Sequence, residues 1–96
     1  MKEMIAQLVR KISCNKKAIE TYQLGSGSYY ICAWRLEQAA GNHAFDDHYE
    51  DFGITEDDGH KIRAFFQGMH SSPLEFRTMV DSWIDEALEP ISRKKG

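Results

Sequence analysis

The side chains best suited to chemistry lie close together near the middle of the chain. His43 and His48 flank Asp46 and Asp47, and imidazole nitrogens and carboxylate oxygens are ligands for zinc and other divalent metals. The two histidines are five residues apart, whereas ligands on one helical face are three or four apart. We therefore expect a solvated acidic surface here and no metal site, because runs of charge are usually exposed.

Cysteine chemistry would need Cys14 or Cys32 beside a histidine and an orienting acid. The two cysteines lack CxxC spacing, and we expect them to be reduced thiols. The chain contains no GxSxG or HExxH motif, and the segment 25–28, GSGS, lacks the lysine of a phosphate-binding loop. We expect a protein that is not an enzyme and that needs no cofactor.

Aromatic and acidic residues are interleaved in residues 41–54, GNHAFDDHYEDFGI. The aromatic residues recur at intervals of four and three, which predicts a short helical segment that docks its rings and presents its acids outward. Such a surface suits a basic protein partner, because aromatic anchors supply contact energy and carboxylates accelerate encounter. The predicted partner-binding residues are Phe45, Asp46, Asp47, Tyr49, Glu50, Asp51, Phe52, Asp57 and Asp58.

The net charge of −3 hides an uneven distribution along the chain. Residues 1–35 carry six basic and two acidic side chains, a balance of +4, whereas residues 36–89 carry thirteen acids and three bases, a balance of −10. Three further basic residues follow in the last four positions. The acidic half is therefore the part of the chain that we expect to attract a basic partner.

Length and composition predict one soluble domain. Ninety-six residues suit a single core spanning 1–96, with 90–96 as a flexible basic tail. No uncharged apolar run is long enough to cross a membrane, so we expect no membrane partner. Glu3, Gln7 and Arg10 interrupt any signal-peptide core, which predicts a cytoplasmic protein.

The chain should be organised around a central helix at residues 28–40, SYYICAWRLEQAA. Its apolar side chains are so dense that a helix here must be covered on nearly every side. Ser28 is the expected N-cap, and Gly41 with Asn42 provides the C-terminal stop.

The first 24 residues carry an apolar stripe at helical spacing. Poor helix formers at 13–15 leave two interpretations, one long helix or two helices at 3–13 and 16–24. A third interpretation pairs 21–24 with 29–34 as a β-hairpin across 25–27, which would make the fold α+β.

The second half predicts two more helices. Thr55 is the expected N-cap of a helix reaching Met69, and Ser72 with Pro73 marks the start of a final helix that Pro90 ends. The short connection predicts an antiparallel helical hairpin, packed on the central helix. The predicted fold class is therefore all-α, a small bundle of four or five helices.

Residues 18–34 resemble the helix-turn-helix of phage-repressor-type regulators. Leu24 and Gly25 are followed by Ile31, six residues after the glycine, and by Trp34 three residues later. This resemblance implies a small DNA-binding regulator using residues 16–36. Arg35 is the only positive charge that the would-be recognition helix contributes.

We therefore expect a non-catalytic protein-binding or inhibitor protein, of the sort carried by mobile elements. Small acidic proteins can inhibit nucleic-acid enzymes by occupying the basic groove meant for phosphates. DNA binding is the alternative. Homodimerisation is a further expectation, because eleven aromatic residues exceed what one small core would cover.

Overall fold

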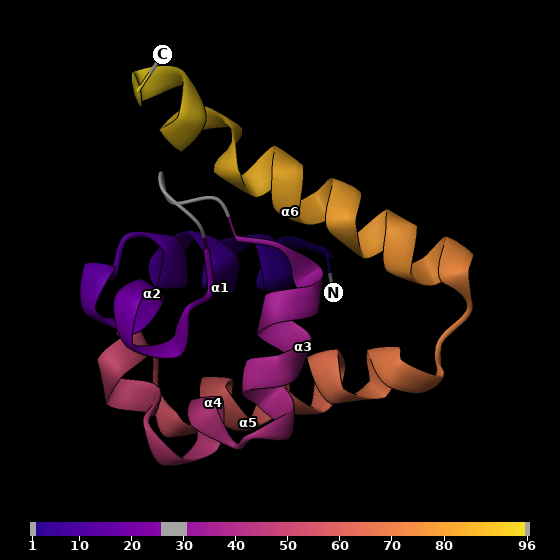
Figure 1. Ribbon diagram of the computed structural model, residues 1–96, viewed down its shortest axis with the longest axis horizontal. Coiled ribbons are helices and arrows are strands. Elements are labelled where there is room, and N and C mark those ends of the chain that lie inside the picture. The colour runs from indigo at the N-terminus through magenta and orange to yellow at the C-terminus, as the bar shows by residue number, and fades with distance from the viewer. Residues whose placement is uncertain (1, 26–30, 96) are drawn as a thin grey trace.

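The computed structural model describes residues 2–25 and 31–95, and over these ranges the protein is all-α. This confirms the predicted fold class, with six α-helices and two 3₁₀ turns in the described chain (Figure 1). A single antiparallel bridge, Gly25 to Ile31, is the only β-pairing in those residues. The elements are α1 (Lys2–Ser13), α2 (Lys16–Tyr22), α3 (Ala33–Gly41), α4 (Ala44–Asp47), η1 (Tyr49–Phe52), α5 (Glu56–Gly68), η2 (Met69–Ser71) and α6 (Leu74–Lys95).

The N-terminal region forms two helices, as the second interpretation predicted. The break falls at Cys14 and Asn15, where the Asn15 side chain accepts a 3.1 Å hydrogen bond from the backbone N–H of Ala18 and caps α2. Gln23 ends α2 in the left-handed conformation, with φ of 52°. The capping residue Asn15 interrupts the apolar stripe, so this region forms two helices and not one.

The central helix is shorter than predicted. Cys32 is extended and α3 starts only at Ala33, so the prediction of a helix through Ile31 and Cys32 is wrong; Ser28 lies outside the described residues. Ile31 is fully buried in its bridge to Gly25, where a β-branched residue packs well. The cap comes from elsewhere in the chain: the Asp81 carboxylate accepts a 3.3 Å hydrogen bond from the N–H of Ala33.

The last two helices both pack on α3, as predicted. They move apart from each other beyond the turn that connects them. Figure 1 shows α3 between α5 below it and α6 above it, with the chain reversing direction at η2. The rings of Phe65 and Phe76 join the two helices near the turn, with centroids 6.0 Å apart. Beyond that contact α6 packs chiefly along α1, where Arg10 Nε donates to the carbonyl oxygen of Ala87 at 3.1 Å.

Two boundary predictions for α6 need correction. Ser72 does not cap it; the hydroxyl donates back to the carbonyl oxygen of Gly68 at 3.0 Å. Pro90 does not end it, because α6 continues to Lys95 and the predicted tail is helical that far. Ala87 and Leu88, three and two residues before the proline, are buried, so packing holds the helix in the turn that precedes it.

One core fills the space between the helices. A buried acid sits beside it: Glu37 is only 3% exposed and lies 3.2 Å from the guanidinium of Arg77 on α6. Every helix in the described chain is too short or too polar to span a membrane. The largest fully buried side chains are Phe45, Phe52, Phe66, Ile5, Ile12, Leu24, Ile31, Leu36, Ile62, Met69, Ile84 and Val9.

Candidate functional site

The interleaved acidic and aromatic segment folds as α4 followed by η1 and lies at the lower edge of the molecule in Figure 1. Its rings face inward: Phe45 and Phe52 are fully buried, with centroids 4.8 Å apart, and Tyr49 is half-buried against the core. The two phenylalanines therefore cannot touch a partner, and their prediction as contact residues is wrong. Burial of their apolar area instead fixes the segment on the core.

Gly59 lets α4 approach α5 closely. A Cβ atom at this position would lie 2.2 Å from the carbonyl oxygen of Phe45 and 3.2 Å from Cβ of Tyr49. Only glycine leaves room for the α4 backbone at this distance. The glycine that weakens the first turn of α5 is thus required for docking the acidic segment.

Asp46 points into a cluster of basic side chains and not outward. Its side chain is 12% exposed, and its two oxygens each lie 3.1 Å from a histidine Nδ1, that of His43 and that of His60. Arg63 Nε lies 2.6 Å from Oδ2 but its N–H is not aimed at that oxygen, so this contact is an ion pair and not a hydrogen bond. Asp46 therefore ties α4 to α5, and its role as a contact residue stays a prediction.

His43, a member of this cluster, adopts a left-handed backbone conformation. His43 has φ of 59°, although the two residues before it, Gly41 and Asn42, adopt the left-handed region more readily. Its ring reaches Asp46 three residues later. Among the described residues no group of three or more histidine, cysteine, aspartate or glutamate side chains is placed to hold a metal ion.

Asp51 is also engaged within the protein. It accepts a 3.2 Å hydrogen bond from Lys17 Nζ and another of 3.2 Å from the hydroxyl of Tyr22, both on α2. The hydrogen bond from Lys17 holds the pKa of Asp51 below its ordinary value, with a smaller contribution from Tyr22 and against the effect of burial. Burial, and then the neighbouring Asp51 carboxylate, raise the pKa of the Tyr22 hydroxyl.

Two acids of the segment do face solvent without a partner. Asp47 and Glu50 are exposed, and neither makes an ion pair or side-chain hydrogen bond within the described parts of the chain. Asp57 is exposed but lies 3.1 Å from Lys61, and the backbone N–H of Asp58 donates to Thr55 Oγ1 at 3.1 Å, which confirms the predicted cap of α5. Asp47 and Glu50, the two exposed acids of the α4–η1 segment that have no side-chain partner among the described residues, are called the acidic pair below.

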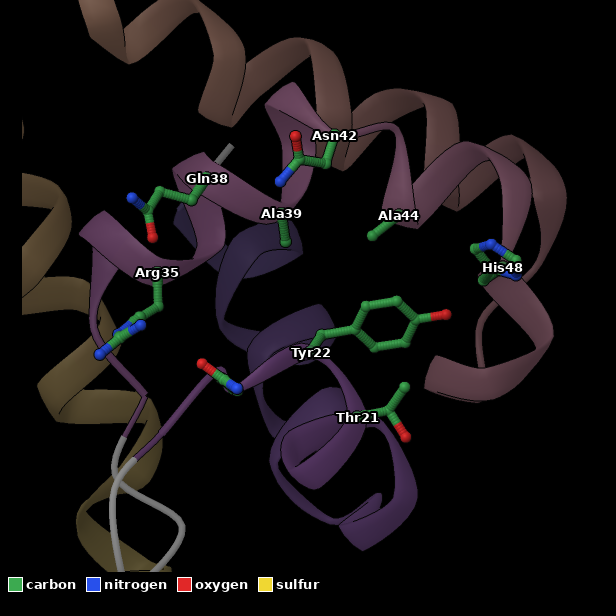
Figure 2. Close-up of a pocket in the computed structure, with 9 residues that line it drawn as sticks. Thr21, Tyr22, Arg35, Gln38, Ala39, Asn42, Ala44 and His48 are labelled. Atoms are coloured by element: carbon green, nitrogen blue, oxygen red, sulfur yellow. The ribbon is translucent and has the colours of Figure 1, made fainter.

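A cavity of about 390 Å³ lies beside this segment, between α2, α3 and the start of α4 (Figure 2). Its residues come from separate elements, so no single stretch of the sequence predicts it. One pattern in the sequence points to the cavity: Arg35, Gln38 and Asn42 recur at intervals of three and four residues and form a polar stripe along α3 and its C-cap. The lining residues are Thr21, Tyr22, Gln23, Arg35, Gln38, Ala39, Asn42, Ala44 and His48.

The described part of the segment that resembles a helix-turn-helix does not have the geometry of that motif. Residues 23–32 separate α2 from α3, whereas the turn of this motif has about three or four residues. Leu24 and Ile31 are buried, but Ile31 lies in the bridge and not on a helix. The part of the pattern at 26–30 lies outside the described residues.

Comparisons of this chain with protein-family models, with curated proteins and with solved structures gave no match. The fold and the site together define a small all-α protein whose function has to be argued from its own residues.

Proposed function

We propose that the protein is a non-catalytic binding protein whose acidic pair contacts a basic protein partner. The observation that carries this proposal is the difference between neighbouring acids: Asp46 and Asp51 are engaged within the fold, whereas Asp47 and Glu50 are exposed and unpaired among the described residues. Unpaired carboxylates keep their charge available for a partner.

The segment holds the backbone of these two residues in place. Buried Phe45 and Phe52 anchor it, and Asp46 and Asp51 tie it to α5 and α2. A segment that is already ordered loses little conformational entropy on binding, which favours affinity. Half-buried Tyr49 lies between the two acids in sequence and is the aromatic side chain best placed to add contact area.

Affinity capture from a host lysate tests the proposal. The test variant carries D47K and E50K, and the control carries E75K and D85K, two exposed acids of α6 with the same total charge change. We expect wild type and the control to retain the same basic protein, identified by mass spectrometry, and the test variant to lose it. Equal retention by all three proteins would contradict the proposal.

DNA binding, the alternative function, predicts a different dependence on salt. A protein that contacts phosphates binds duplex DNA with an affinity that falls steeply as salt rises, and a gel shift detects this. The long connection between α2 and α3 gives this alternative less support than the acidic pair gives protein binding.

Inhibition of a nucleic-acid enzyme and carriage by a mobile element are finer parts of the same proposal. The identity of the captured partner tests both. Homodimerisation is a separate proposal, supported by Leu74 and Met79 on α6, which are 77% and 48% exposed, and light scattering tests it.

A further inference from the structure

The cavity beside α4 has the volume of a small-molecule site and a mainly polar lining. Its volume of about 390 Å³ falls within the range of ligand pockets, roughly 300–1,000 Å³. Figure 2 shows the side chains of Ala39 and Ala44 pointing into the hollow, which stays open because both are small. Three separate elements supply the remaining walls.

The charge of the lining favours an anion. None of the nine lining residues is acidic, although the chain has a net charge of −3. Arg35 lies in this lining, and its guanidinium carbon is 4.7 Å from the centroid of the Trp34 ring. It makes no ion pair with any residue that the structure describes, and a planar guanidinium held in this way suits a carboxylate or a phosphate.

Two carboxamides lie near Arg35 in the lining. Gln38 is on α3 and Asn42 caps that helix, and Figure 2 shows both on the α3 side of the hollow, with Gln38 directed away from Tyr22. Carboxamides both donate and accept hydrogen bonds, so they can bind further oxygens of an anionic group or polar atoms next to it.

The opposite wall is aromatic, and its Tyr22 ring is held in place. The ring of Tyr22 stacks on Phe52 with centroids 4.9 Å apart, and its hydroxyl donates to Asp51 at 3.2 Å. The ring of His48 lies 5.9 Å from that of Tyr22. Figure 2 shows Tyr22 facing the hollow from α2 and His48 at its far end. A planar ring packs favourably against such side chains.

We propose that this cavity binds a small molecule that combines a planar ring with a carboxylate or phosphate group. The anionic group contacts Arg35 and the carboxamides, and the ring lies against Tyr22 and His48. This site is distinct from the acidic pair, so it neither requires nor excludes the proposed protein partner.

Titration monitored by amide chemical shifts tests the proposal with two anionic probes. Uridine monophosphate carries a phosphate and 4-hydroxyphenylacetate a carboxylate, while uridine is the neutral control. We expect at least one anion to give saturable shifts at lining residues with a Kd of about 1 mM or below, and uridine to bind at least about tenfold more weakly. Binding by only one anion identifies the group that the site prefers.

Three variants connect any binding to the cavity. R35Q should weaken binding of the anion at least about tenfold, because a hydrogen bond to a charged group is lost. K11Q removes the same charge from an exposed position on α1 and should leave the affinity unchanged. A39L should block the cavity with a larger side chain. If A39L does not fold, the affinity of R35Q still tests the proposal.

Three results would overturn the proposal. They are an absence of saturable shifts with both anions up to about 10 mM, uridine binding as tightly as uridine monophosphate, and equal affinity of R35Q and wild type.

Discussion

Replacing Gly59 with alanine would put a Cβ atom 2.2 Å from the carbonyl oxygen of Phe45. A backbone oxygen cannot rotate out of the way as the end of a side chain can, so α4 or α5 must shift. Overpacking of this kind costs about 1–3 kcal/mol, whereas alanine at an unobstructed helical position gains about 0.5–1 kcal/mol over glycine. We expect a net loss of about 2 kcal/mol, since the backbone clash falls at the upper end of that range.

Gly68 supplies a matched control in the same helix. It has helical backbone angles, with φ of −63°, and a Cβ atom there would meet nothing within 4 Å. G68A should therefore be neutral or more stable than wild type by up to about 1 kcal/mol. Only G59A should therefore lower stability, because only this change blocks the α4 backbone.

Urea unfolding followed by circular dichroism measures both variants. For a domain of this size, a loss of about 2 kcal/mol corresponds to a melting temperature roughly 8–16 °C lower. If G59A were as stable as wild type, α4 would not rest on Gly59 as described. If G68A lost as much stability as G59A, the loss would not be specific to the α4 contact.

Three further predictions concern the charged groups of the segment. D46N should lower the free energy of unfolding by about 1–3 kcal/mol, because it weakens three contacts with basic groups. D47N should change the free energy of unfolding by less than about 0.5 kcal/mol. The midpoints of urea unfolding compare the two variants, and equal effects would contradict the assigned roles. Since the pKa of Asp51 is lowered by folding, its contribution exists above about pH 4 and disappears as pH falls through the lowered value, so the stability difference between wild type and D51N should shrink in acid. Since the pKa of Tyr22 is raised, its contribution exists below about pH 10 and disappears as pH rises through the raised value, so wild type should lose stability relative to Y22F in alkali. Differences that do not vary with pH would contradict both assignments.

The helical class and most helix positions could be predicted from the sequence because they depend on local patterns. The cap at Thr55 needs only neighbours within one helix, and the helix that it begins ends at Gly68, one residue before the predicted end at Met69. The start of the central helix failed for a different reason. Its cap comes from Asp81, which is 48 residues away, and no local pattern reveals such a contact.

Some features of the candidate site were likewise predictable from local sequence patterns, and others depend on residues far away in the chain. The spacing of Phe45 and Phe52 predicts that their rings dock on the core. Their complete burial could not be predicted, because it depends on how closely α4 approaches Gly59. Asp46 and Asp47 are chemically identical neighbours in the sequence. The positions of His60 and Arg63, on another helix, make Asp46 a structural group, whereas Asp47 has no side-chain partner among the described residues.

Capture by wild type, by D47K/E50K and by E75K/D85K tests the central claim most directly, because all three are compared on one partner. The claim is that a segment anchored by buried rings presents two unpaired carboxylates to a basic protein. It predicts that wild type and the α6 variant retain that protein equally, while reversal of the acidic pair abolishes retention at moderate salt. Undiminished retention by D47K/E50K, with its fold intact by circular dichroism, would contradict it.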